Sequence, residues 1–232
     1  MRSPTPRRST GRTWRSGPGP EEGVDYLYLG DIGDNNAQRE EVTVYRVPEP
    51  EVSTGSDTPT ANEFIDVETL TLRYPDRPHD AETLLVDPVS GDVLIVTKEV
   101  VGGPSIVFRT PWAVFPHPTT LEQVGEIDFT PLASNVDVPD DAPPLVRGLP
   151  NLPTGGDVSP DGSVVIIRTY GSVWVFERPE GGPLWDIVRG VPCEAPSAIE
   201  EQGEAIAFDA DGRGYTTISE GTFPPLNHFI VK

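Results

Sequence analysis

A short phrase that the chain repeats constrains its fold more than any other feature. Residues 79–87 and 202–209 each place a glutamate before an apolar run, end in an aspartate, and lead through a glycine turn into a second strand-like stretch. Residues 156–162 form a looser third copy, also followed by an apolar stretch. Because a single β-propeller blade cannot bury both of its faces alone, hairpins that restart with one phrase are typical of successive blades.

The rest of the sequence fits an all-β chain. Proline (27 residues) and glycine (23 residues) are abundant, and alternating apolar and polar stretches are short and bounded by turn residues. We predict about four units of three or four strands, at residues 25–30, 41–47, 63–73, 82–86, 93–98, 105–109, 121–129, 164–170, 172–177, 184–188, 205–208, 215–219 and 228–231. A β-sandwich would not restart its strands with one phrase. The predicted fold is a β-propeller with about four recognisable blades, truncated at its N-terminus from a ring of five or more.

Residues 1–20 differ from the remainder of the chain, because they hold five of its 17 basic residues and no acidic residue. One interpretation is a disordered basic arm. The other is a shifted reading frame: codons for Val-Asp-Trp-Glu-Asp-Leu-Ala-Val (GTC GAC TGG GAG GAC CTG GCG GTC), read one nucleotide late, encode the Ser-Thr-Gly-Arg-Thr-Trp-Arg-Ser of residues 9–16. We therefore expect a disordered or out-of-frame segment at 1–20, a propeller domain at 21–232, and lost upstream blades. The coding DNA tests this hypothesis.

Charge and cysteine content exclude several classes of partner and site. Thirty-seven acidic against 17 basic residues give a formal net charge of −20, which repels nucleic acid and anionic membrane surfaces. Cys193 is the only cysteine, so neither an internal disulfide nor a cysteine-based zinc site is expected. No stretch approaches the ~20 apolar residues of a membrane span, and no apolar signal-peptide core follows the basic N-terminus. Most of the acidic side chains are expected on the solvated surface.

Acids in the repeated phrase form the candidate site. The first strand of each propeller hairpin lines the central channel, so residues at the same place in the repeat meet near the axis. We assign Glu82, Asp157 and Glu204 to equivalent places. Asp80 precedes Glu82 by two residues and therefore shares its face of the strand. With the loop after residues 25–30 included, the predicted metal ligands are Asp34, Asn35, Asp80, Glu82, Asp157 and Glu204.

Several carboxylates on one axis need a countercharge, and the sequence offers two kinds. One is a hard cation, Ca²⁺ before Mg²⁺ or Zn²⁺, bound by about 6–8 oxygen atoms. The other is a structural ring of basic partners, for which Arg39, Lys98 and Arg168 are the candidates. His79 is expected to be exposed or locally bonded rather than a general base. The aspartates beside the hairpin turns are expected to bond turn amides instead of a ligand; they are Asp87, Asp161 and Asp209.

The motifs, taken together, resemble a known group of proteins. Gly-Asp-Ile-Gly-Asp-Asn at 30–35, His-Asp-Ala-Glu at 79–82 and Gln-Gly-Glu-Ala at 202–205 resemble uncharacterised bacterial β-propeller proteins of actinobacterial type, which are secreted or lipid-anchored. The resemblance covers residues 24–232 and implies an extracellular or cell-envelope location. The group carries an Asp-Trp-Glu-Asp phrase before the first motif, and this chain departs from that pattern. A more distant similarity to phytase-like esterase and SdiA-regulated propellers implies that acidic channel residues hold calcium.

These observations predict a β-propeller binding or scaffold module whose acidic channel rim holds Ca²⁺. Two alternatives stay open. One is a metal-assisted phosphoesterase or esterase of phytase-like type, in which a metal-bound water attacks the substrate. The other is a non-functional truncated fragment. The expected partner is an unidentified small molecule or protein, with no nucleic acid and no membrane span, and the expected oligomeric state is a monomer.

Overall fold

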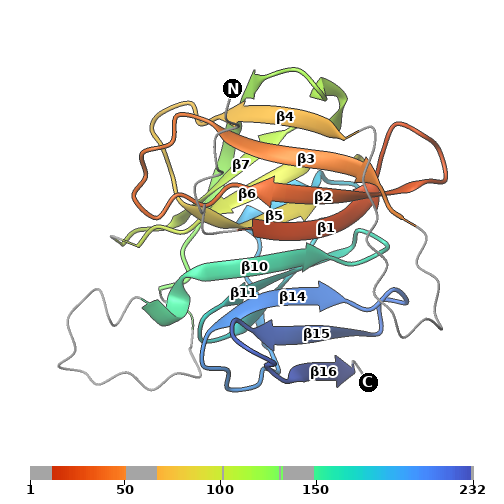
Figure 1. Cartoon of the computed structure of the whole chain (residues 1–232). Coiled ribbons are helices and arrows are strands. Elements are labelled where there is room, and N and C mark those ends of the chain that lie inside the picture. Colours follow the sequence, from red (N-terminus) through yellow and green to blue (C-terminus); the bar gives the residue numbers. More distant parts are fainter. Residues whose placement is uncertain (1–11, 51–66, 101, 131, 133–148, 231–232) are drawn as a thin grey trace.

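Four small sheets make up the protein in a computed structural model that describes residues 12–50, 67–100, 102–130, 132 and 149–230 (Figure 1). The first sheet contains β1 (Arg12–Pro18), β2 (Asp25–Asp31), β3 (Val42–Pro48) and β4 (Glu68–Arg73), with the two-residue β8 (Thr119–Thr120) beside β4. The second contains β5 (Ala81–Val86), β6 (Val93–Thr97), β7 (Ser105–Thr110) and β9 (Glu122–Ile127). The third contains β10 (Pro153–Val158), β11 (Val164–Thr169), β12 (Val173–Glu177) and β13 (Cys193–Ala195). The fourth contains β14 (Gly203–Phe208), β15 (Gly214–Ser219) and β16 (Leu226–Ile230).

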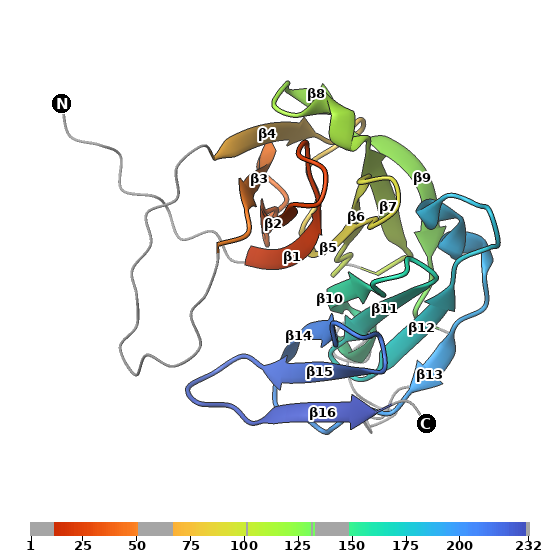
Figure 2. The ribbon, with the colours of Figure 1, turned by 90° about the vertical axis from the view of Figure 1, so that its right-hand side faces the viewer.

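The sheets are arranged as the blades of a four-bladed β-propeller, which confirms the predicted fold class. Successive strands pair antiparallel within each blade, and only β8 joins its neighbour in parallel. The first strand of each blade, namely β1, β5, β10 or β14, lies nearest the centre (Figure 2). We refer to the sheets in chain order as blades 1 to 4.

The hydrophobic core lies between neighbouring blades. One cluster fills the space between blades 1 and 2, a second lies between blades 2 and 3, and a smaller third lies between blades 3 and 4. All five residues of β6 are buried, as expected for a strand covered on both faces. By contrast, every second residue of β16 is exposed, so the outermost strand of blade 4 is covered on one face.

The predicted outer strand at residues 184–188 is wrong. These residues belong to the 3₁₀-helix η3 (Leu184–Arg189), and β13 is the outer strand of blade 3. Leu184 and Ile187 are the buried residues of η3, and their spacing of three is the repeat of a 3₁₀-helix. Pro183 before the helix and Gly190 after it mark the two ends. Two further short 3₁₀-helices are η1 (Trp112–Val114) and η2 (Leu149–Asn151).

The fold begins earlier than the predicted boundary at residue 20. Strand β1 pairs with β2 along its whole length, from Arg12 opposite Asp31 to Pro18 opposite Asp25. The Arg15 side chain is 9% exposed, and its Nε donates to the carbonyl oxygen of Leu84 in blade 2 at 2.9 Å. The remaining residues of the predicted arm, 1–11, lie outside the described part of the chain. The reading-frame hypothesis concerns the coding DNA and stays a prediction.

No helix within the described ranges is long and apolar enough to cross a membrane.

Candidate functional site

Three β-bulges at one end of the inner strands define the candidate site, which we call the rim. The register between the first two strands of a blade shifts around Glu82 in blade 2, around Thr154 in blade 3 and around Glu204 in blade 4. A bulge leaves one residue out of the ladder and re-aims its side chain. Glu82 and Glu204 are therefore equivalent, as predicted. The third equivalent residue is Thr154 instead of Asp157, which lies three residues further along β10.

A second set of equivalent residues follows the second strand of blades 2, 3 and 4. The backbone N–H of Lys98 donates to the carbonyl of Asp80, that of Tyr170 to Leu152, and that of Glu220 to Gln202. The three bonds have the same place in their blades, so the rim receives three different side chains from one structural position: Lys98, Tyr170 and Glu220. Of these three residues, only Lys98 was predicted from the sequence, as a basic partner of the rim carboxylates.

A continuous series of hydrogen bonds connects residues of these two sets, from blade 2 through blade 3 to blade 4. Lys98 Nζ donates to Glu82 Oε2 and to the Tyr170 hydroxyl oxygen, both at 2.8 Å. The ammonium also lies 4.7 Å from the centre of the Tyr170 ring. The Tyr170 hydroxyl in turn donates to Glu204 Oε1 in blade 4 at 3.4 Å. One lysine and one tyrosine thus connect the two equivalent glutamates.

Within blade 4, the side-chain amide of Gln202 extends this series of hydrogen bonds. Gln202 Nε2 donates to Glu204 Oε1 at 2.9 Å and to Glu220 Oε2 at 2.7 Å. The amide supplies hydrogen bonds but no positive charge to the two carboxylates. The blade 4 part of the rim is therefore more negative than the blade 2 part, where Lys98 faces Glu82.

Burial raises the carboxyl pKa values at the rim. Burial, with contributions from Glu204 and Asp80, raises the pKa of Glu82 to about 7 although Lys98 opposes the shift. Burial likewise raises the pKa of Asp80 and of Glu204. Burial lowers the pKa of Lys98, but the charge and hydrogen bond of Glu82 together with those of Tyr170 outweigh it, so the pKa of Lys98 is raised. The rim thus holds more carboxylate than its single ammonium can neutralise.

The loop after β2 reaches the rim through its backbone. The Asp34 N–H donates to Asp80 Oδ1 at 2.6 Å, so the two predicted ligands do lie together. The Asp34 carboxylate itself accepts the backbone N–H groups of Gln38 and Arg39, both at 2.5 Å, and closes its own loop. Asn35 is exposed. The second oxygen of Asp80 is buried and has no hydrogen-bond partner among the described residues.

Asp157 lies deeper along the axis and connects blades. Its Oδ2 accepts the backbone N–H of Phe208 in blade 4 at 2.8 Å, and its Oδ1 lies 3.9 Å from Arg15 Nε in blade 1. Burial raises the pKa of Asp157 despite the opposing charge of Arg15. Asp157 therefore lies apart from the rim, with its oxygens directed to neighbouring blades, and its role as a metal ligand stays a prediction.

The basic candidates divide between the rim and other sites. Lys98 neutralises Glu82, as the basic-partner interpretation predicted, whereas Arg39 pairs with Asp31 at 3.0 Å. Arg168 Nη2 lies 3.3 Å from Glu200 Oε2, and both side chains are 2% exposed. A Cβ atom on Gly203 would lie 1.8 Å from Arg168 Nη2, so this buried pair requires glycine in the Gln-Gly-Glu-Ala motif. Glu200 was not among the predicted site residues, because it lies outside the repeated phrase.

His79 and the turn aspartates have local roles. His79 is 1% exposed, with Nδ1 2.8 Å from Glu99 Oε1 and Nε2 3.1 Å from Asp76 Oδ1. His79 is thus locally bonded, one of the two predicted outcomes. Asp87 accepts the Val89 N–H at 2.9 Å, as a turn cap should. Among the other two aspartates, Asp161 accepts the Ser163 N–H, whereas Asp209 Oδ2 lies 2.7 Å from His228 Nε2.

The rim is not a ready-made metal centre. Within the described ranges, no three histidine, cysteine, aspartate or glutamate side chains converge in a way that could hold a metal ion. The carboxylates of Glu82 and Glu204 are connected indirectly, by hydrogen bonds that pass through Lys98 and Tyr170. A cation could reach both carboxylates only if the Lys98 ammonium withdrew. The calcium prediction therefore stays a prediction.

Comparison with known proteins assigns the chain to no family. No protein-family model and no curated protein sequence matches the chain. Hydrazine synthase of Kuenenia stuttgartiensis is similar in structure, with a TM-score of 0.40 and 11% identity over 88% of this chain and 60% of that chain. A candidate 6-phosphogluconolactonase of Bacteroides uniformis has a TM-score of 0.37 and 14% identity over 92% of this chain and 55% of that chain. The chain therefore spans less than two thirds of either protein.

Proposed function

We propose that this β-propeller is a binding module that takes a cationic ligand at the rim, with Ca²⁺ as the first ion to test. The observation that carries the proposal is the excess of carboxylate: Asp80, Glu82 and Glu204 have raised pKa values around one ammonium, Lys98. Each of these carboxylates would be stabilised in its ionised form by a further positive charge. The unpartnered oxygen of Asp80 supports the same conclusion.

Binding would require a small rearrangement. Carboxylate, amide and hydroxyl oxygens at the rim suit Ca²⁺, whose coordination accepts irregular sets of oxygen ligands. Lys98 would have to swing away from Glu82, and this competition weakens the site. We therefore expect a dissociation constant of about 10⁻⁴–10⁻³ M, which is typical of extracellular calcium modules. An extracellular or cell-envelope location, implied by the family resemblance, is part of this proposal.

Calorimetry and thermal unfolding test the proposal. The variants are Glu82→Gln and Glu204→Gln, and the matched control is Glu126→Gln on the exposed side of β9. At a Ca²⁺ concentration of 100 times Kd, binding stabilises the folded state by about 2.7 kcal/mol, which raises Tm by about 5–10 °C. We expect this rise in the wild type and in Glu126→Gln, and a clearly smaller one in the two rim variants. Equal responses in all four proteins would exclude the rim as the binding site.

A second candidate is metal-assisted ester or phosphoester hydrolysis. It is favoured by the Glu82 carboxyl, whose pKa of about 7 suits a general acid or base near neutral pH. A screen with chromogenic phosphomonoesters and acyl esters, with and without Ca²⁺, tests it. Turnover that disappears in Glu82→Gln and persists in Glu126→Gln would favour an enzyme over a binding module. No turnover with any substrate, together with Ca²⁺ binding, would leave the binding module.

A further inference from the structure

A cleft between blades 3 and 4 lies at the end of the blades opposite the rim. It has a volume of about 580 Å³, within the range typical of small-molecule sites. The turn between β10 and β11 and the turn between β14 and β15 border it, and the short strand β13 forms its outer side. Because the rim lies at the start of the inner strands, the cleft is a separate site.

The short β13 explains why the space between these blades is open. Its three residues pair only with Val173, Trp174 and Val175, so the last part of β12 has no outer neighbour in the described sheet. The core cluster between blades 3 and 4 is correspondingly small, with four buried residues against fifteen between blades 1 and 2. The cleft is therefore a gap in interblade packing that solvent or a ligand can enter.

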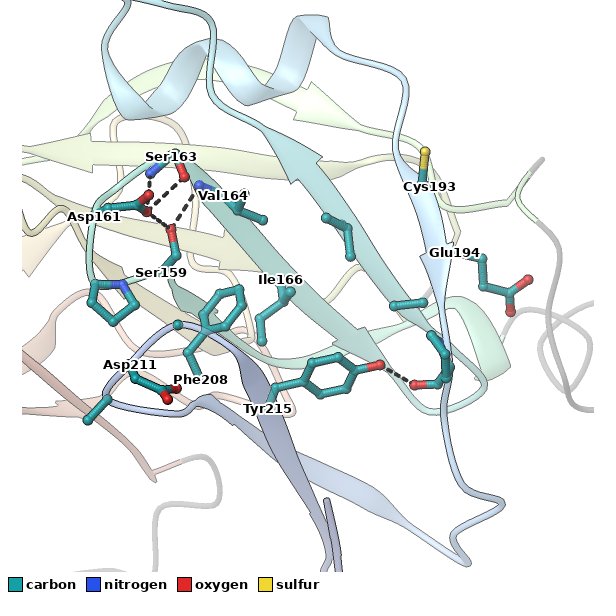
Figure 3. Close-up of a pocket in the computed structure, with 16 residues that line it drawn as sticks. Ser159, Asp161, Ser163, Val164, Ile166, Cys193, Glu194, Phe208, Asp211 and Tyr215 are labelled. Atoms are coloured by element: carbon teal, nitrogen blue, oxygen red, sulfur yellow. Dashed lines mark hydrogen bonds between the residues drawn. The ribbon is translucent and has the colours of Figure 1, made fainter. Parts of the chain in front are cut away.

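The floor of the cleft is apolar and aromatic. Ile166, Phe208 and Tyr215 lie together at its base (Figure 3). Val164 and Val175 also line the cleft. The Tyr215 hydroxyl donates to the Pro196 carbonyl, which fixes the orientation of the ring. Tyr215 also stacks on Phe229, with ring centres 5.1 Å apart. An apolar group of a ligand would thus meet a preformed surface.

The charged residues that line the cleft are all acidic. Asp161, Glu194 and Asp211 carry carboxylates, and none of the lining residues is basic. Hydrogen bonds from Ser159 and Ser163 lower the pKa of Asp161 to about 2, so it stays ionised at neutral pH. Asp211 lies beside Phe208 in the close-up, whereas the Glu194 side chain points away from the floor (Figure 3).

We propose that this cleft binds a compact organic cation, namely an amine attached to an aromatic or short alkyl body. The body would pack on Ile166, Phe208 and Tyr215, and the ammonium would lie toward Asp211 and Asp161. Aromatic faces attract cations as well as apolar groups, so Phe208 and Tyr215 favour both parts of such a ligand. Charge complementarity identifies this class of ligand, because the charged residues of the lining are carboxylates. Arg213 lies outside the lining and pairs with Asp211 at 3.9 Å, and such an exposed pair is weak enough for Asp211 to accept a ligand ammonium.

Three probes of one shape separate the contributions of charge and apolar surface. They are 2-phenylethylamine, 2-phenylethanol and 3-phenylpropionate, titrated into the wild-type protein and followed by calorimetry and ligand-observed NMR. We expect the amine to bind about fivefold more tightly than the alcohol, and the carboxylate not to bind measurably. The preference for the amine should shrink when salt rises from about 0.05 M to about 0.5 M.

Two variants assign the binding to the cleft. Asp211→Asn keeps the oxygen that caps the Arg213 N–H but removes the charge; its control is Asp128→Asn, which keeps the equivalent cap on Thr130 in blade 2. We expect Asp211→Asn to abolish the preference for the amine and Asp128→Asn to retain it. Ala195→Leu, which narrows the cleft, should weaken both the amine and the alcohol. Equal affinity for all three probes, no binding of any, or an amine preference unchanged in Asp211→Asn would overturn the proposal, whatever the outcome at the rim.

Discussion

At the scale of single residues, Glu82 is the most informative member of the rim. Burial, together with the neighbouring acids, raises the pKa of its carboxyl from 4.5 to about 7, although the Lys98 ammonium opposes the shift. Between those pH values the folded protein binds more protons than the unfolded chain. The free energy of unfolding contributed by Glu82 is therefore greatest below pH 4.5 and is lost as pH rises through 7.

This shift gives a pH-dependent prediction. Because the pKa of Glu82 rises from 4.5 to about 7 on folding, the free energy of unfolding should fall by about 3 kcal/mol between pH 5 and pH 8. Glu82→Gln imitates the protonated carboxyl, so it should match the wild type near pH 5 and exceed it in stability near pH 8. Urea unfolding across this pH range measures the difference, with Glu126→Gln as a control that follows the wild type. A Glu82→Gln protein that is less stable than the wild type at pH 8 would contradict the direction of the shift.

The sequence predicted the equivalence of Glu82 and Glu204 correctly. Glu82 and Glu204 were equivalent because both precede an apolar run in the same phrase, and the register of β5 and β14 bears this out. Asp157 was misplaced because the third copy was aligned on its aspartate, whereas the bulge aligns Thr154 with the two glutamates. Tyr170 and Glu220 were missed, although each follows a Thr or Ser at the end of a strand, as Lys98 does. That shared position becomes visible only once the hydrogen bonds align the blades.

At the scale of elements, the bulges explain how an inner strand can pair with the second strand of its blade and still supply a side chain to the rim. The residues before and after each bulge continue the ladder, while the bulge residue is released toward a neighbouring blade. In blade 3 this residue is Thr154, which is 4% exposed and donates its hydroxyl to the Gly203 carbonyl at 2.7 Å. The bulge in β10 therefore connects blade 3 to the bulge in β14.

Removing this hydroxyl tests the role of the bulge. Thr154→Val keeps the shape of the side chain but removes the donor, so we expect a loss of about 1–2 kcal/mol in the free energy of unfolding. Thr120→Val, at an exposed position of β8, serves as the control and should change stability by less than about 0.5 kcal/mol. Hydrogen exchange should locate the loss in β14 and β15. An effect spread evenly over all four blades would argue against a local connection.

The elements themselves were predictable where the pattern of side chains was regular. Strands β2 and β3 alternate buried and half-buried residues, and the sequence placed both within one residue of their observed ends. Strand β1 lacks such alternation, since its residues include two arginines, a glycine and a proline, and it was missed. Its conformation depends on pairing with β2 and on the contacts of Arg15, which are tertiary features.

At the scale of the whole molecule, Asp157 and Arg15 connect all four blades near the axis. Arg15 belongs to blade 1 and donates to Leu84 of blade 2, while Asp157 of blade 3 faces Arg15 and accepts from Phe208 of blade 4. Burial lowers the pKa of Arg15 and raises that of Asp157, so each charge depends on the other. These contacts could not be deduced from the repeated phrase, because they join different blades, whereas the phrase describes the hairpin within one blade.

Asp157→Ala should therefore loosen the molecule as a whole. The alanine leaves the Phe208 N–H without its acceptor and Arg15 without an anionic partner, and we expect a loss of about 2–3 kcal/mol, less than for a fully buried pair because Asp157 is 20% exposed. The slope of urea unfolding should also fall if the blades begin to unfold separately. Glu126→Gln is again the control. An unchanged midpoint and slope would mean that the blades are held together by the interblade core alone.

The equivalent rim positions have a consequence for how such a molecule can change over evolutionary time. Each of blades 2, 3 and 4 offers one bulge residue and one residue after its second strand, currently read as Glu and Lys, Thr and Tyr, Glu and Glu. Both positions lie outside the apolar clusters between the blades. Substitutions at these two positions of a blade can therefore change the side chains at the rim and leave the apolar clusters between the blades unchanged.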